Sequence, residues 1–280
     1  MKNILLPTDF SENSFNAITY VINAFESYKC TFFLLHVNRL NNLVEGDTPY
    51  VPTQDIIENL YDKPARKKLK AVLKKIAQEL PNNKNHKFYT LTDYNFFIES
   101  IRKQVKEKNI DLIAMGTKGA SGLKEYIVGS NTGDVITKVK CSTLVVPENA
   151  KYAPLNEVAF PTDFTATYDF NTLQPILDIL EKSNASLRIV HINTKDETLN
   201  IDQQTNKNLL DDFFENSEYS YHFLTHKKVE DAVQCFVESR AIDMIVMIAK
   251  NLNYFQQILF HSKVEKISYH TNIPFLVLHE

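Results

Sequence analysis

The sequence predicts an α/β protein of two tandem, doubly wound domains, each a five-stranded parallel sheet with helices on both faces. Short apolar segments alternate with segments of helical periodicity, which is typical of parallel sheets with right-handed crossovers. This alternation occurs twice along the chain, and the apolar segments of the second half are similar in sequence to those of the first. Five of the six glycines gather in residues 115–133, directly after a predicted strand. In such folds a ligand binds beyond the carboxyl ends of the strands, where the strand order reverses.

Short apolar segments in the first half of the chain are expected to be buried strands, and the segments between them to be helices. The strands are predicted at Ile4–Leu6, Phe32–Val37, Leu112–Met115 and Leu144–Val146, with a weaker one at Lys87–Leu91. Apolar residues at helical spacing predict one helix over residues 69–80 and another over residues 98–105. A further helix is predicted to begin near Ser130, after the glycine-rich stretch.

The second half of the chain repeats the first. The segment NILLPTDF, which begins at Asn3, returns as EVAFPTDF at Glu157. Three later segments also recur: FLLHVN as RIVHIN, NIDLIAM as AIDMIVM, and CSTLVVPE as IPFLVLHE. The repeat predicts two domains, residues 1–150 and 151–280, joined by the polar stretch ENAKYAPLNE.

Each copy leaves its last strand at an edge of the sheet, where unpaired backbone groups need a partner. We therefore expect the TLVVP strand (Thr143–Pro147) to lie beside the FLVLH strand (Phe275–His279). This pairing would join the two copies as a pseudo-dimer within one chain. Association of two chains into a homodimer is left open.

The composition excludes several classes of protein. With 44% hydrophobic and 23% charged residues in 280 positions, the chain can bury a sizeable core. Its net charge of −3 argues against a nucleic-acid partner, and the basic run Lys63–Lys75 is interpreted as the solvated face of a helix. Three scattered cysteines suggest neither a disulfide framework nor a zinc site. Because no apolar run reaches the length of a membrane span or a signal-peptide core, we expect a cytoplasmic protein without a membrane partner.

The stretch MGTKGASGLKEYIVGSNTG, residues 115–133, has the features of a phosphate-binding loop. It follows a predicted strand and precedes a predicted helix, whose first N–H groups lack helical partners and whose dipole favours an anion. Glycine lets the backbone approach a ligand closely. Neither a Walker A sequence nor the dinucleotide fingerprint GxGxxG is present. A tight surface turn is the alternative interpretation, but such a turn needs only one or two glycines.

The spacing Gly116-x2-Gly119-x9-Gly129-Ser130 matches the nucleotide-binding signature of the universal stress protein family. The longer segment MGTKGASGLKEYIVGSNTGDVI resembles the ATP-binding branch of that family, and ILLPTDFS and LLHV in the first copy fit it too. The resemblance covers the first copy nearly end to end and the second more faintly, so the chain resembles a tandem universal stress protein. It implies Rossmann-like, adenine-nucleotide-hydrolase-like domains that bind ATP, or AMP or ADP.

The resemblance also implies which residues hold the nucleotide. Asp9, at the end of the first strand, would meet the ribose or adenine side, and Val37 and Met115 would line the adenine pocket. The phosphates would lie against the glycine loop and the start of the next helix, at Gly116, Gly119, Gly129, Ser130, Asn131 and Thr132. Lys118 could pair with a phosphate, although the family pattern does not require it.

Two positions near the predicted site also have structural interpretations. Asp9 and Glu12 resemble a capping box, and Asp163 repeats Asp9 in the second copy, so capping and ligand binding both stay open for Asp9. His36 is matched by His191 in a copy without the glycine loop. This match favours a strand-end histidine satisfied by neighbouring backbone over a catalytic group.

The second copy lacks the glycines of the loop. When Asp111 is aligned with Asp243, the positions of Gly116, Gly119 and Gly129 are taken by Ile248, Asn251 and His261, and only Ser262 keeps its counterpart, Ser130. Side chains then occupy the space where a phosphate would approach. The second copy is therefore predicted to be a degenerate domain with a structural role.

Together these observations predict a protein that binds an adenine nucleotide in its first domain and acts as a stress-related sensor or regulator of an unidentified partner. No catalytic residue and no metal ligand is predicted, since the loop offers no evident base for a water and no carboxylate pair for Mg²⁺. Magnesium carried in on the phosphates is left open. Two alternatives also stay open: a slow ATPase or nucleotidyl-transfer enzyme on the same fold, and an interaction module with a vestigial nucleotide site.

Overall fold

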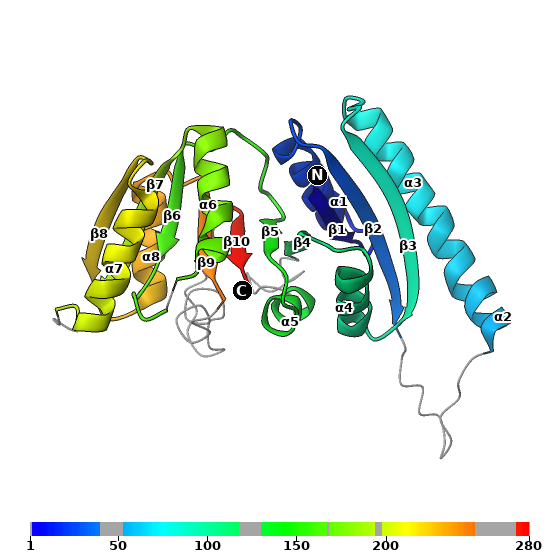
Figure 1. Ribbon diagram of the computed structural model, residues 1–280. Helices are drawn as coiled ribbons and strands as arrows, with labels where there is room; N and C mark the ends of the chain where they lie inside the picture. Colours follow the sequence, from blue (N-terminus) through cyan, green and yellow to red (C-terminus); the bar gives the residue numbers. More distant parts are fainter. Residues whose placement is uncertain are drawn as a thin grey trace, which may run out of the picture. The chain divides into compact units, whose positions relative to one another are not determined.

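The computed structural model of the chain describes residues 2–39, 53–117, 130–166, 168–193, 198–249 and 273–279 (Figure 1). These residues form an α/β structure that divides into two compact units, Met1–Gly116 and Thr117–Glu280. The α/β class predicted from the alternation of apolar segments and helical segments is confirmed. The domain division near residue 150, which rests on the repeat, stays a prediction.

Four parallel strands form the sheet of the first unit, in the order β3-β2-β1-β4. They are β1 (Lys2–Pro7), β2 (Cys30–Arg39), β3 (His86–Asn95) and β4 (Leu112–Thr117). Each strand contains an apolar segment that predicted it. The central residues of β1, β2 and β4 form the core, with Ile4, Leu5 and Leu6 of β1 fully buried, whereas no residue of β3 is buried. After β3 the chain passes back to the other side of β1, so the strand order reverses there.

Helices cover both faces of this sheet. They include α1 (Glu12–Ala24) and α4 (Phe97–Glu107). Between β2 and β3 a continuous helical segment consists of α2 (Gln54–Ile56), the π-helical η1 (Ile57–Asp62) and α3 (Lys63–Glu79). Successive residues of a strand point to opposite faces. Asp93 of β3 pairs with Lys103 of α4, whereas Tyr94 packs on Tyr61 of η1. Therefore α4 covers one face, and η1 with α3 covers the other.

The described residues of the second unit form six strands in the order β5-β10-β9-β6-β7-β8. They are β5 (Thr143–Pro147), β6 (Glu157–Pro161), β7 (Ser186–Asn193), β8 (Tyr219–Thr225), β9 (Met244–Ile248) and β10 (Phe275–Leu278). The five strands from β10 to β8 are parallel, as predicted for a domain of this class. The register also supports the repeat, because Ile4 lies opposite Leu112 and Val158 lies opposite Met244 at equivalent positions.

The predicted pairing of TLVVP with FLVLH is confirmed. Strand β5 runs antiparallel to β10, with Val145 opposite Phe275 and Thr143 opposite Val277. Every residue of both strands is buried. The repeat assigns β5 to the first copy and β10 to the second, so each copy covers the other's exposed strand edge.

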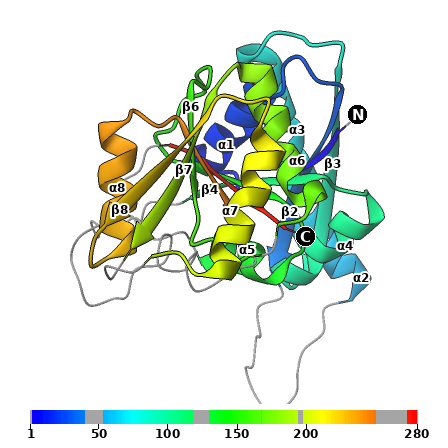
Figure 2. The same ribbon diagram turned by 60° about the vertical axis from the view of Figure 1, so that its left-hand side comes forward.

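The helices of the second unit again lie on both faces. They are α5 (Ser130–Lys138), α6 (Phe170–Ser183), α7 (Ile201–Phe214) and α8 (Val229–Ser239). Phe236 of α8 packs on His222 of β8, and Lys207 of α7 lies 4.1 Å from the ring of Tyr221, the preceding residue of β8. Helices α7 and α8 therefore cover opposite faces of β7 and β8 (Figure 2).

Helices α4 and α8, which the repeat makes equivalent, end in the same way. Asn109 and Ala241 follow the helix caps with φ of 47° and 49°, in the left-handed region. The N–H of the next residue, Ile110 or Ile242, donates to the carbonyl oxygen five positions back at 3.0 Å and 3.1 Å. This is the Schellman arrangement, in which glycine or asparagine is usual and alanine is not.

We predict that Ala241→Gly stabilises the protein. An alanine Cβ costs about 1 kcal/mol or more in the left-handed region, and the greater freedom of glycine in the unfolded chain offsets part of that gain. The expected rise in the free energy of unfolding is about 0.5 kcal/mol, measured by urea denaturation. Asn109→Gly is the matched control and should gain less, because asparagine tolerates this conformation. A loss of stability in Ala241→Gly would contradict the conformation described.

A polar row crosses the sheet of the second unit on the face covered by α8. Arg188 of β7 donates to Glu157 of β6 at 2.7 Å and to the hydroxyl oxygen of Ser220 of β8 at 3.0 Å. Ser220 Oγ lies 2.9 Å from Nε2 of His222. Burial lowers the pKa of His222, and the nearby cations Arg240 and Arg188 lower it further against the opposing effect of Glu157. A neutral His222 that accepts from the Ser220 hydroxyl fits these surroundings.

The lowered pKa of His222 predicts a pH dependence of stability. Below the ordinary histidine pKa of about 6.5, the unfolded chain binds the proton before the folded protein does, so stability falls as the pH falls. His222→Gln, which keeps an acceptor for Ser220, should lose less stability than the unmodified protein between about pH 7 and about pH 5. Urea midpoints at the two pH values measure this difference. An equal loss in both proteins would show that His222 does not contribute.

Candidate functional site

The carboxyl ends of β1, β2 and β4 meet at the point where the strand order of the first unit reverses. Asp9 follows β1, Val37 lies near the end of β2, and Met115 and Gly116 lie near the end of β4. Because β1 pairs in parallel with both β2 and β4, these four predicted residues lie at one edge of the sheet. Open α/β sheets bind their ligands at such a switch point.

These four residues differ in their exposure to solvent. Asp9 is exposed, Val37 and Gly116 are half-buried, and Met115 is buried. Met115 therefore belongs mainly to the core. In the second unit α5 begins at Ser130, as predicted, and the side chain of Thr132 in its first turn is buried. Lys118, Gly119 and Gly129 lie outside the described residues, and the phosphate-binding roles of the loop and of Ser130, Asn131 and Thr132 stay predictions.

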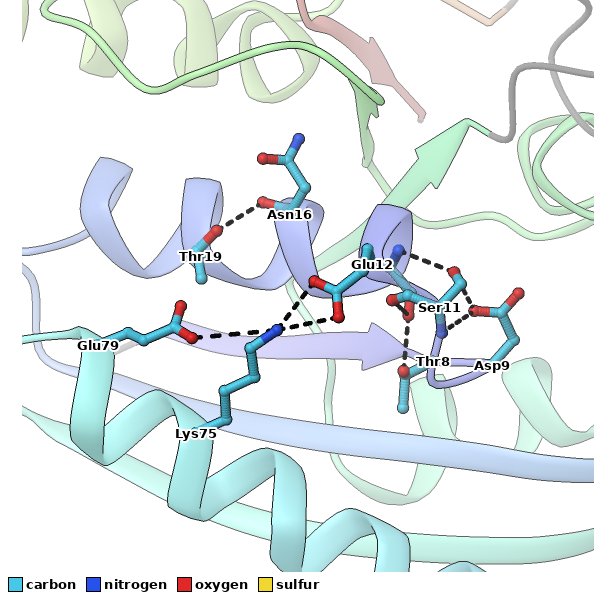
Figure 3. Close-up of polar contacts among 9 residues, drawn as sticks. Thr8, Asp9, Ser11, Glu12, Asn16, Thr19, Lys75 and Glu79 are labelled. Atoms are coloured by element: carbon cyan, nitrogen blue, oxygen red, sulfur yellow. Dashed lines mark hydrogen bonds and ion pairs between the residues drawn. The ribbon is translucent and has the colours of Figure 1, made fainter. Parts of the chain in front are cut away.

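The turn between β1 and α1 is held by its own side chains (Figure 3). Thr8 Oγ1 accepts from the N–H of Phe10 at 3.0 Å. Asp9 Oδ1 accepts from the N–H of Ser11 at 3.0 Å and from its hydroxyl at 2.6 Å. Phe10 has a φ of 69°, which is rare for a bulky residue. These hydrogen bonds hold the backbone in the turn and present the Asp9 side chain at the sheet edge.

Ser11, and not Asp9, is the N-cap of α1. Its side chain accepts from the N–H of Ser14 at 3.2 Å. The interpretation of Asp9 and Glu12 as a capping box is therefore wrong. Burial opposes ionisation of Asp9, but hydrogen bonds from Ser11 and Ser14 outweigh it and hold the pKa of this carboxyl below its usual value. Asp9 is thus an anion at neutral pH.

Helix α3 lies beside α1 at this site (Figure 3). Lys75 of α3 pairs with Glu12 of α1 at 2.9 Å and lies 3.8 Å from the ring centroid of Phe15. Lys68 of α3 lies 5.3 Å from the ring centroid of Phe10. The first turn of α1 is therefore supported from the α3 side, while Asp9 stays exposed.

The second copy builds the same turn. Thr162 Oγ1 accepts from the N–H of Phe164 at 3.0 Å, and Phe164 has a φ of 58°. Asp163 Oδ1 accepts from the N–H of Thr165 at 3.0 Å and from its hydroxyl at 2.8 Å. Because the turn occurs in a copy without the glycine loop, the aspartate has a structural role at both positions. The ligand role of Asp9 stays a prediction.

Helix α7 closes this turn in the second copy. Gln203 donates to the carbonyl oxygen of Asp163 and Asn206 to that of Phe164, each at 2.8 Å. Phe164 is fully buried. Tyr168 stands where the first copy has Ser14, and its hydroxyl bonds to Thr162. Burial raises the pKa of Tyr168, so this phenol stays neutral and fills the region with an aromatic ring.

The strand-end histidines hold the same turns through the backbone. His36 Nδ1 lies 2.8 Å from the carbonyl oxygen of Thr8, and His191 Nδ1 lies 3.0 Å from that of Thr162. A carbonyl oxygen only accepts, so Nδ1 carries the proton in both rings. The interpretation of His36 as a histidine satisfied by neighbouring backbone is confirmed.

Gly116 has a packing reason to be glycine. A Cβ built there would lie 2.7 Å from Asn13 Oδ1 and 2.8 Å from the backbone oxygen of Asn13. Helix α1 therefore rests directly on the end of β4. Asn13 is the residue that the sequence analysis missed, because nothing in the spacing of the chain shows which side chain faces this glycine.

Neither a metal cluster nor a membrane span occurs in the described ranges. No three histidine, cysteine, aspartate or glutamate side chains among these residues gather in a way that could hold a metal ion. Within the same ranges, every helix is too short or too polar to cross a bilayer.

The sequence model that describes the universal stress protein family matches residues 1–147, more than half of the chain. The chain belongs to the universal stress protein family. The relative "Universal stress protein MJ0577" from Methanocaldococcus jannaschii is 30% identical over 161 residues, covering 52% of this chain and 94% of the relative. "Universal stress protein MJ0531" from the same organism is 29% identical over 150 residues, covering 54% of this chain and 84% of the relative.

A solved universal stress protein from Archaeoglobus fulgidus is similar over the whole length. It covers 98% of this chain and 97% of its own, with a TM-score of 0.73 and 19% identity. At that identity the similarity shows the fold alone. The predicted fold of two tandem universal stress domains is confirmed.

We predict that Gly116→Ala destabilises the ligand-free protein. The added Cβ would clash with both Asn13 Oδ1 and the Asn13 backbone oxygen, and such overpacking costs about 1–3 kcal/mol of unfolding free energy. The double variant with Asn13→Ala should recover only part of this loss, because the backbone contact remains. Urea denaturation of the two single variants and the double variant measures the coupling. Complete recovery would show that the contact with the Asn13 backbone oxygen does not affect the free energy of unfolding.

Proposed function

We propose that the first domain, residues 1–150, binds ATP or another adenine nucleotide, and that the protein is a stress-related sensor or regulator. One observation carries the proposal. The segment with the spacing Gly116-x2-Gly119-x9-Gly129-Ser130 begins in β4, at the switch point, and ends on the first residue of α5. A glycine-rich loop from a strand end to a helix start is suited to phosphate groups.

The start of α5 and the Asp9 carboxylate suit different parts of a nucleotide. The first N–H groups of α5 favour the phosphates. Asp9, an exposed anion at the switch point, would repel phosphate and accept from a ribose hydroxyl or an amino group. Mg²⁺ would arrive with the phosphates, since the described residues supply no cluster for it.

The second domain, residues 151–280, serves as a structural partner in this proposal. Its turn is closed by α7 and Tyr168, and Ile248 at the end of β9 replaces Gly116. A chain would then bind one nucleotide. The pairing of β5 with β10 supports the intrachain pseudo-dimer. We further propose a cytoplasmic protein that acts on an unidentified protein partner, without nucleic acid or membrane.

A regulatory role is favoured over an enzymatic one by the residues at the turn. His36, whose ring packs on that of Phe10, donates from Nδ1 to the carbonyl oxygen of Thr8 and so supports the turn. The Ser11 hydroxyl, which donates to Asp9 at 2.6 Å, also serves the turn, because its oxygen caps α1 by accepting from the N–H of Ser14. Hydrolysis of ATP, if it occurs, is therefore expected to be weak.

Isothermal titration with ATP tests the proposal. The unmodified protein should bind one nucleotide per chain. Gly129→Asp places bulk and negative charge where the phosphates meet α5 and should abolish binding, whereas Ser130→Ala removes one donor and should weaken it about tenfold. His261→Asp, the same change at the equivalent position of the second copy, is the matched control and should bind as the unmodified protein does.

Three outcomes would contradict the proposal. Two nucleotides per chain would show that the second copy also binds, and full binding by Gly129→Asp would remove the loop from the site. No binding at millimolar ATP would favour an interaction module with a vestigial site. Mass spectrometry of the small molecules released when the natively purified protein is denatured would identify the nucleotide independently.

A further inference from the structure

The candidate site contains a buried acceptor that belongs neither to the glycine signature nor to the residues implied by the family resemblance. Asn13, the second residue of α1, is 8% exposed, and its Oδ1 has no hydrogen-bond partner among the residues that the structure describes. Buried side-chain oxygens normally have one. The neighbouring hydroxyl groups of Ser14 and Thr8 are hydrogen-bonded, since Ser14 Oγ lies 2.9 Å from both Thr8 Oγ1 and the carbonyl oxygen of Ser11. Asn13 is therefore the exception in an otherwise satisfied turn.

The unpaired oxygen lies at the switch point itself. Gly116, at the end of β4, faces Asn13 so closely that a Cβ there would lie 2.7 Å from Oδ1. Asn13 reaches this position from the first turn of α1, which follows β1. The amide oxygen thus lies between the start of α1 and the end of β4. A ligand of this fold is expected at this place.

The groups around Asn13 favour a hydrogen-bond donor over an anion. Asp9, in the turn before α1, is a carboxylate whose pKa is lowered, whereas the Glu12 carboxylate pairs with Lys75 of α3. The Asp9 carboxylate and Asn13 Oδ1 act only as acceptors. A phosphate carries no donor at neutral pH and would be repelled, whereas a hydroxyl or an amino group would find acceptors.

We propose that Asn13 Oδ1 accepts a hydrogen bond from a hydroxyl or amino group of the nucleoside part of the ligand, and that Asn13 thereby selects ligands with that donor. This inference rests on the proposed nucleotide binding and adds a specificity residue to it. In the ligand-free protein the oxygen is buried and unpaired, which is unfavourable, and the donor of the ligand removes that penalty.

Titrations with nucleotide analogues test the proposal. ATP is compared with three analogues that each lack one donor: the 2′-deoxy form, the 3′-deoxy form, and the purine riboside triphosphate without the 6-amino group. One of them should bind the unmodified protein about tenfold more weakly than ATP, and Asn13→Ala should bind that analogue and ATP equally. Which analogue loses affinity distinguishes a ribose hydroxyl from the amino group.

A stability measurement separates ligand selection from a purely structural role. Asn13→Ala removes an unpaired buried oxygen, so its urea midpoint without ligand should equal or exceed that of the unmodified protein. Ser14→Ala, the matched control on the next residue, removes a bonded hydroxyl. It should lower the midpoint and keep the preference for ATP over the analogue.

The outcomes distinguish this inference from the proposed function. If the unmodified protein binds no adenine nucleotide, the proposed function fails and this inference with it. If the unmodified protein binds ATP and all three analogues alike, or if Asn13→Ala keeps the preference, the inference alone fails. A lowered midpoint for Asn13→Ala with unchanged selectivity would assign Asn13 to packing.

Discussion

The arrangement of the first domain depends on the hydrogen bond from the Phe10 N–H to the Thr8 hydroxyl. This bond, with those that Ser11 donates to Asp9, holds a phenylalanine in a left-handed conformation that its side chain disfavours. The chain can then leave β1, turn within a few residues and enter α1 with Asp9 at the sheet edge. The second copy uses the same bonds at Thr162 and Asp163, so the turn belongs to the fold and precedes any ligand.

What differs between the copies is the element that covers this turn. In the first copy α3 supports α1 through Lys75 and leaves Asp9 exposed. In the second copy the shorter α7 brings two amide side chains onto the turn's own carbonyl oxygens, and a tyrosine replaces a serine beside them. Among the described residues, side chains of the following helix bond to the turn's carbonyl oxygens in the second copy and not in the first.

Gly116 has a packing role at the position where we propose that the nucleotide binds. Its missing Cβ lets α1 rest on β4 and places a buried amide oxygen at the switch point. In the second copy Ile248, the last residue of β9, occupies the equivalent position. Loss of the glycine and closure of the turn therefore accompany each other in that copy.

The sequence by itself determined the strands, the start of α5, the repeat and the pairing of β5 with β10. These follow from periodicity and from the need of an edge strand for a partner, which are local or general properties. It also determined the role of His36, since His191 repeats it without the loop. Only the tertiary structure decided that Ser11 caps α1, that Asn13 faces Gly116, and that α7 closes the second turn. Those contacts depend on which side chains meet across elements, including residues far apart along the chain, and no spacing within the sequence specifies them.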